Sequence, residues 1–171
     1  PRCSRWSRVC SSPRPAPSHA LVASNLGMLL GLPFHHGEGG PGGWWILDEP
    51  ELHLGPEELA PDLAGWRRDR MPRLPETAYF SLPPDWICEV LSPSTEEIDR
   101  SEKLEIYAEH GVRHVWLAQP VLRTLEVYRL DPGGSYLLVR NHRGRRSVKA
   151  EPFDAVPLDL RQARDDAERR V

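Results

Sequence analysis

The chain has 171 residues, 39% of them hydrophobic and 27% charged, as is typical of one soluble domain with a buried core. Its net charge of −3 excludes a polycationic protein, so a surface for nucleic acid would have to be local. The three cysteines form neither a zinc motif nor an even-numbered disulfide framework, and no apolar run is long enough to cross a membrane. We therefore expect a protein of the reducing cytoplasm with no membrane partner.

The N-terminal segment, residues 1–17, contains four arginines, no acidic residue and many prolines and serines. This composition predicts a disordered basic tail. Such a tail can act as an arm that touches phosphates, but composition alone favours a ragged terminus. A helix is predicted from Ser18, an N-cap residue, to about Gly31, because apolar residues recur there at helical spacing. His19 lies in its first turn, where most histidines are solvated, and a role at a site is the less favoured alternative.

The glycine-rich segment 33–43 is predicted to be a loop. Its His35, His36 and Glu38 do not indicate a metal site, because adjacent histidines rarely share one ion. The segment also lacks the Lys-Ser/Thr end of a phosphate-binding P-loop, which excludes nucleotide binding of that kind.

Short apolar stretches then predict three strands, at 43–46, 51–54 and 61–66. A turn is expected at 55–58. Asp62 opens the third strand directly after Pro61, and taken alone it is a turn aspartate. Residues 69–85 are rich in proline and lack periodicity, so they are predicted to form a surface loop.

The strand expected at 86–91 contains an acid in an apolar run. The run is short and rich in branched and aromatic residues, as in a strand that is covered on both faces. Glu89 is the exception, because a carboxylate in such a place has to be paired, bind a metal or reach solvent at a sheet edge. Pro93 ends the strand, since proline cannot donate to a sheet ladder.

A helix is predicted directly after this strand. Ser94 and Glu97 have the spacing of a capping box, and Gly111 provides a left-handed stop after about His110. Asp99, Lys103 and Tyr107 are spaced four residues apart and therefore share one face of the helix.

Further strands are predicted at 113–117, 124–130 and 135–140, the last two forming a hairpin. The segment 141–149 is basic and is expected to be either a solvated loop or an edge that holds a phosphate backbone. Residues 161–171 are predicted to form a charged C-terminal tail.

Asp62, Glu89 and Lys103 lie on elements that can pack side by side. Two carboxylates and a backbone carbonyl, here that of Val90, can hold a hard divalent ion such as Mg²⁺, or Mn²⁺. A nearby lysine can orient the attacking water or stabilise developing charge. Spacing alone instead favours a surface ion pair between Lys103 and Asp99, worth about 0.3–0.5 kcal/mol, and a solvated Glu89.

A longer ordered series resembles a known family, and it consists of Glu89 to Thr95, Asp99, Lys103, Leu104, Tyr107, Ala108, Gly111, Val112, Trp116, Leu117 and Glu126 to Tyr128. The series is similar to the Uma-two family of restriction-endonuclease-like bacterial proteins, in the PD-(D/E)xK nuclease superfamily. Pro61 and Asp62 resemble the "PD" strand of that family. The resemblance covers roughly residues 18–160 and is strongest over 85–130.

The resemblance implies a single α/β domain over 18–160, with a restriction-endonuclease-like central mixed sheet flanked by helices. It implies that Asp62 and Glu89 are metal ligands. Leu91 occupies the usual position of the catalytic lysine, but related families place that lysine on a neighbouring helix, and Lys103 matches this variant. His19 and Tyr107 match recurrent family positions and are possible accessory residues. The implied function is a metal-dependent endonuclease that hydrolyses DNA, as a possible homodimer. The alternatives are an inactive nuclease-fold module for binding DNA or protein, and a metal-dependent hydrolase with another substrate.

Overall fold

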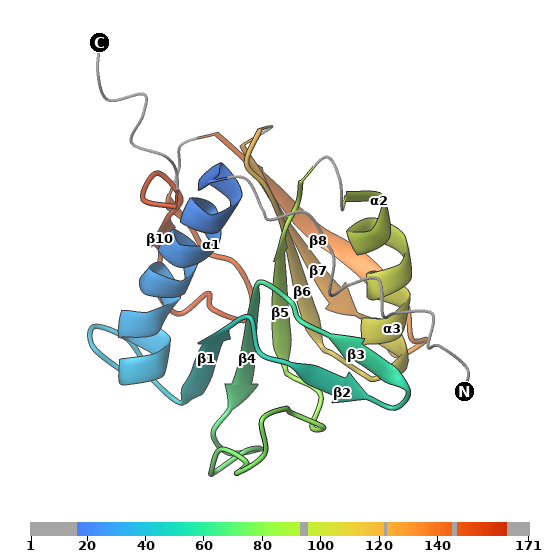
Figure 1. Ribbon diagram of the computed structural model, residues 1–171. Helices are drawn as coiled ribbons and strands as arrows, with labels where there is room; N and C mark the ends of the chain where they lie inside the picture. Colours follow the sequence, from blue (N-terminus) through green and yellow to red (C-terminus); the bar gives the residue numbers. More distant parts are fainter. Residues whose placement is uncertain (1–16, 93–95, 122, 145–146, 164–171) are drawn as a thin grey trace.

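A six-stranded mixed sheet forms the centre of the computed structural model, which describes residues 17–92, 96–121, 123–144 and 147–163 (Figure 1). The strand order is β1-β4-β5-β6-β7-β8, and only the β5–β6 pair is parallel. Its strands are β1 (Trp44–Asp48), β4 (Leu63–Arg67), β5 (Trp86–Val90), β6 (His114–Gln119), β7 (Thr124–Leu130) and β8 (Tyr136–Arg143). Two small hairpin-like pairs complete the fold, β2 (Leu52–Leu54) with β3 (Glu57–Leu59) and β9 (Ser147–Val148) with β10 (Leu158–Asp159).

Helices cover both faces of the sheet. On one face lies α1 (Pro17–Leu30), continued by the π-helix η2 (Gly31–His36). On the other lies the connection between β5 and β6, made of α2 (Glu96–Ile98), the π-helix η3 (Asp99–Lys103) and α3 (Leu104–Glu109). Figure 1 shows α1 and α3 on opposite sides of the strands. The expected α/β fold with a mixed sheet flanked by helices is therefore confirmed.

Each sheet face has its own apolar core, because side chains alternate along the strands. Trp86, Cys88 and Val90 of β5 pack with α1, whereas Ile87 and the following Leu91 pack with Ile106 and Tyr107 of α3. Glu89 shares the second face by this alternation. The strand is buried throughout, as its apolar run predicts.

Most predicted elements are confirmed, and three boundaries differ for physical reasons. The segment 33–43 is not all loop, because Phe34 is buried against Phe153 and the helical backbone continues to His36. The turn expected at 55–58 is shorter, because Leu59 is buried and its strand pairs with β2.

The third difference is at the basic segment 141–149. Its first residues continue β8, because the facing strand β7 offers partners as far as Thr124, which is opposite Arg143. Part of this segment is therefore an edge strand and not a loop. No helix in the described ranges is long and apolar enough to span a membrane.

Candidate active site

The sheet register brings Asp62 and Glu89 together at one end of the sheet. In the antiparallel β4–β5 pair, Leu63 lies opposite Cys88, so the residue before β4, Asp62, is next to Glu89. The backbone N–H of Val90 donates to Oδ2 of Asp62 at 2.7 Å and fixes the carboxylate there. Asp62 is therefore not a plain turn aspartate.

The helical connection returns Lys103 to the same place. Its Nζ lies 3.1 Å from Oε1 of Glu89 and 2.8 Å from Oδ1 of Asp99, the latter contact lying outside hydrogen-bond geometry. The Lys103 side chain is 17% exposed, and the Asp99 and Glu89 side chains are 3% exposed. The alternatives of a surface Lys103–Asp99 pair and of a solvated Glu89 are therefore wrong. The predicted cap at Ser94 lies outside the described residues.

A π-helical turn carries both partners of this ion pair. The segment η3 runs from Asp99 to Lys103, between the α-helical segments α2 and α3. π-Helical turns inside α-helices occur frequently at functional sites. The sequence pattern predicts the shared face of Asp99 and Lys103 but not this change of helix type, nor the burial of Asp99.

Two further predicted residues contact the carboxylates. The hydroxyl of Tyr107, which is fully buried, donates to Oε1 of Glu89 at 2.6 Å. Nε2 of His19, in the first turn of α1, lies 3.5 Å from Oδ2 of Asp62. The structure thus brings all the sequence-predicted side chains into one cluster, formed by His19, Asp62, Glu89, Lys103 and Tyr107.

The electrostatics of this cluster follow from burial. Burial raises the pKa of Asp62 to about 6, although the Val90 N–H and Lys103 oppose the shift. Burial also raises the pKa of Glu89 to about 7, again against the attraction of Lys103. For Lys103 itself, burial disfavours the ammonium, but the attraction of Glu89 and Asp99 outweighs burial and raises its pKa. The ammonium of Lys103 is therefore the positive charge that attracts all three carboxyl groups, those of Asp62, Glu89 and Asp99.

Each of the two carboxylates has one oxygen engaged and one left open. Val90 and His19 both approach Oδ2 of Asp62, and Tyr107 and Lys103 both approach Oε1 of Glu89. Among the described residues, no hydrogen bond reaches the other oxygens, Oδ1 of Asp62 and Oε2 of Glu89. Two open carboxylate oxygens fit a hard divalent cation. Within the same ranges, no three His, Cys, Asp or Glu side chains form a metal-binding group.

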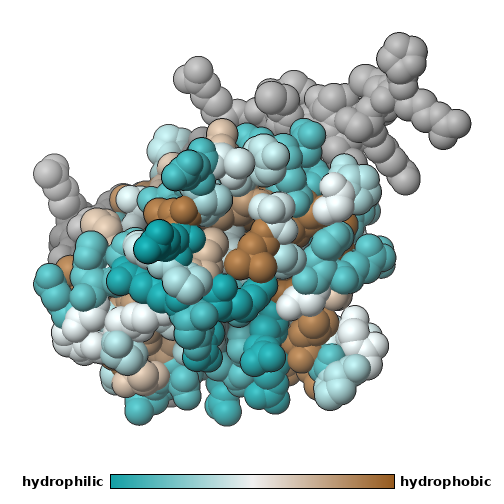
Figure 2. All heavy atoms as spheres, turned by 90° about the horizontal axis from the view of Figure 1, so that it is seen from below, coloured by the Kyte–Doolittle hydropathy of each residue, from teal (hydrophilic) through white to brown (hydrophobic). Residues whose placement is uncertain are grey.

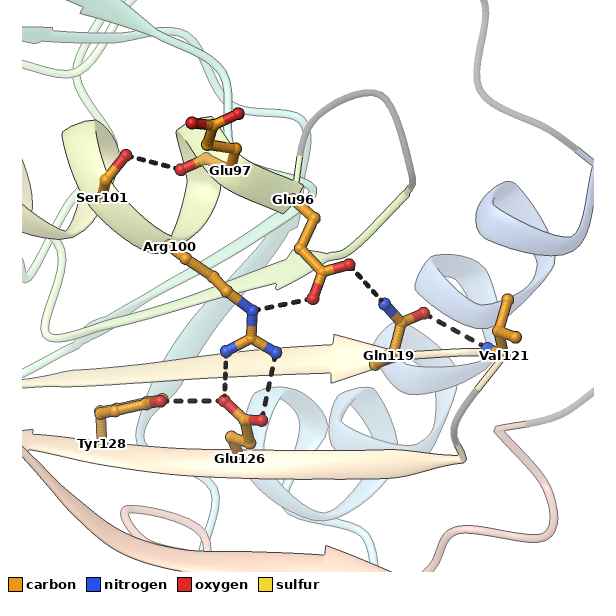
Figure 3. Close-up of polar contacts among 8 residues, drawn as sticks. All are labelled: Glu96, Glu97, Arg100, Ser101, Gln119, Val121, Glu126 and Tyr128. Carbon is orange, nitrogen blue, oxygen red and sulfur yellow. Dashed lines mark hydrogen bonds and ion pairs between the residues drawn. The ribbon is translucent and has the colours of Figure 1, made fainter.

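An arginine clamp holds the lysine-bearing turn to the sheet, and sequence reasoning missed it (Figure 3). Arg100 donates from Nη1 and Nη2 to the two carboxylate oxygens of Glu126 on β7, at 2.7 and 3.1 Å. It also donates from Nε to Glu96 at 2.9 Å, and Gln119 of β6 donates to the second oxygen of Glu96 at 3.1 Å. The hydroxyl of Tyr128 donates to Glu126 at 2.9 Å. The only sequence signal is the four-residue spacing of Glu96 and Arg100.

The comparisons with known proteins agree with this geometry. A family model described as "Putative restriction endonuclease" matches residues 8–161. It is the model of the Uma2 family, which is the Uma-two family that the sequence resembles. The chain belongs to the Uma2 family. The match begins inside the predicted basic tail, so the boundary at residue 18 stays a prediction. No curated protein matches this Uma2 chain.

A solved structure has the same fold as this Uma2 chain. It is described as "a putative nuclease belonging to DUF820" from Anabaena variabilis, and its TM-score is 0.69 at 20% sequence identity. The similarity covers 88% of this chain and 82% of the other. A fold shared at such low identity does not show that two proteins have the same activity, so an activity of this chain has to be inferred from the residues of its candidate site.

Proposed function

We propose that this Uma2 protein is a metal-dependent endonuclease that hydrolyses phosphodiester bonds in DNA. The observation that carries the proposal is the convergence of Asp62, Glu89 and Lys103 at one end of the sheet, with one open oxygen on each carboxylate. Asp62, Glu89 and the carbonyl of Val90 would hold Mg²⁺, with Mn²⁺ as a substitute. When bound, such an ion polarises a phosphodiester and lowers the pKa of bound water.

The side chains of the cluster have separate tasks in this proposal. Lys103, held as an ammonium between two carboxyl groups, positions or activates the attacking water and stabilises the charge that develops on the phosphate. Tyr107 fixes the rotamer of Glu89 through its hydroxyl. His19 lies against the engaged oxygen of Asp62 and so limits the movement of that carboxylate.

The test compares cleavage of supercoiled and linear DNA by the wild type and by Asp62→Ala and Glu89→Ala, with Mg²⁺ or Mn²⁺. The matched control is Asp154→Ala, an exposed aspartate outside the cluster. We expect the wild type and the control to cut and both site variants to fail. Equal cleavage by the wild type and the site variants would refute the site assignment. Sedimentation with and without DNA then tests the proposed homodimer, since cutting both strands requires two sites.

The alternative is a nuclease-fold module that binds DNA or protein without cutting. One observation favours it, namely that no third acidic ligand completes a metal-binding group among the described residues. DNA binding by all variants with no cleavage by any of them would favour this module. Metal-dependent hydrolysis of another substrate, lost in the same variants, would favour the remaining alternative of a hydrolase that does not act on DNA.

A further inference from the structure

A charged pocket lies at the opposite end of the sheet from Asp62 and Glu89. The strand β4 begins beside Asp62 and ends at Arg67, while β5 and β6 begin beside Asp85 and Arg113. At about 3.3 Å per residue, the six steps from Asp62 to Arg68 span roughly 20 Å. This end is the face seen in Figure 2, where strongly hydrophilic side chains gather near the centre.

The pocket has a volume of about 380 Å³, which is within the size range of small-molecule sites. Its lining includes Arg67, Arg68, Asp69, Asp85, Arg113 and His114. The lining thus comes from the starts of β1, β5 and β6, from the end of β4, and from the loop residues beside them.

Both aspartates of the pocket already have cationic partners. Arg67 donates to both oxygens of Asp69, at 3.1 and 2.6 Å. Arg70, outside the lining, donates to Asp85 at 2.7 Å. His114 lies 3.3 Å from the carboxylate of Glu151, so that histidine is also occupied.

Two arginines of the pocket remain without an acidic partner among the described residues. Arg68 donates from Nε to the carbonyl of Trp44 and from Nη2 to the carbonyl of His35, and its guanidinium lies 4.0 Å from the centre of the Trp45 ring. These contacts fix the position of the guanidinium, and within the described ranges Nη1 donates no hydrogen bond. Arg113 is exposed and has no ion pair in the described ranges. A chain of net charge −3 therefore concentrates two uncompensated positive charges in one pocket.

We propose that this pocket binds a small phosphorylated ligand, with the phosphate held between Arg68 and Arg113. Guanidinium groups match the geometry of phosphate oxygens, and a group that is already fixed loses little freedom on binding. The volume leaves space for a nucleoside beside the phosphate. The inference is independent of the proposed nuclease activity, because it involves none of the side chains of the candidate active site.

The test measures binding to the full chain by calorimetry, with three probes: inorganic phosphate, a deoxynucleoside monophosphate and the unphosphorylated deoxynucleoside. We expect the two phosphorylated probes to bind and the nucleoside to bind far more weakly. Arg113→Ala should weaken the binding of phosphate by about tenfold, because it removes a charged hydrogen bond. Arg113 supports no described contact of the fold through its side chain, so this variant is expected to remain folded.

Matched variants distinguish binding in this pocket from binding elsewhere on the protein. Arg140→Ala removes an exposed arginine on β8, and Asp62→Asn changes the candidate active site, so both should bind phosphate as the wild type does. Equal affinity in the wild type and Arg113→Ala, or loss of binding in Asp62→Asn, would overturn the proposal. Weaker DNA binding in Arg113→Ala, with no binding of the free phosphorylated probes, would also overturn it and assign the pocket to the DNA backbone.

Discussion

Asp62 is an ionisable group in a place that disfavours its charge, so Asp62→Asn is expected to stabilise the metal-free protein. The side chain is 14% exposed, and burial raises its pKa from 3.8 to about 6. At 1.36 kcal/mol per pKa unit, a rise of about two units corresponds to about 3 kcal/mol. Asparagine keeps the shape and the acceptor for the Val90 N–H without the charge.

The sign of the pH dependence is the reverse of that of a salt-bridged acid. Well below the unfolded pKa of 3.8, both the folded and the unfolded states hold the proton, and Asp62 contributes little. Between the unfolded pKa of 3.8 and the folded pKa of about 6, the unfolded state loses its proton first, so stability falls as the pH rises. Above this window the full penalty persists. The advantage of Asp62→Asn should therefore grow from near zero at about pH 2–3 to about 3 kcal/mol at about pH 8.

Urea unfolding at a series of pH values, in the presence of EDTA, measures this difference. Asp154→Asn, at an exposed aspartate, is the control and should show no comparable gain. Excess Mg²⁺ or Mn²⁺ should stabilise the wild type but not Asp62→Asn, because only the wild type keeps the proposed carboxylate ligand. An Asp62→Asn protein that is no more stable than the wild type at about pH 8 would refute the reasoning.

Three other substitutions test the cluster and the arginine clamp that holds its helical turn to the sheet. Lys103→Met should lower the rate of DNA cleavage by about 10²–10³-fold while Mn²⁺ still binds by calorimetry, and unchanged cleavage would exclude a catalytic lysine. Tyr107→Phe removes a buried donor to Glu89 and should lower the free energy of unfolding by about 1–3 kcal/mol in urea, with cleavage reduced much less than in Lys103→Met. Arg100→Ala should destabilise by about 1–3 kcal/mol, and its effect should not add to that of Glu126→Gln, whereas additive effects would contradict the clamp.

The sequence predicts the central part of the fold because local and tertiary preferences agree there. The apolar run of β5 is buried on both faces. Asp62, Glu89 and Lys103, which the sequence puts on elements that can pack side by side, lie near one another. The helix over 17–30 follows its apolar spacing, with Val22, Leu26 and Leu30 buried.

The remaining features depend on contacts between distant residues, which local patterns do not contain. The helical path of 31–36 is set by burial of Phe34 against Phe153, far along the chain. The Arg100–Glu126 pair joins a helical turn to a strand 26 residues later. The burial of Asp99 depends on how the connection packs on the sheet, whereas its spacing to Lys103 is the same in a surface pair.

The parallel pairing of β5 and β6 also affects how such a protein can change over evolution. Parallel neighbours need a long crossover connection, whatever the function of the protein. Here that obligatory connection carries Lys103, while the sheet carries Asp62 and Glu89. A lysine on the crossover can shift by one helical turn, or be replaced, without changing the register of any strand. Substitutions in α2, η3 and α3 can therefore alter the chemistry of the candidate site while the six-stranded scaffold is retained.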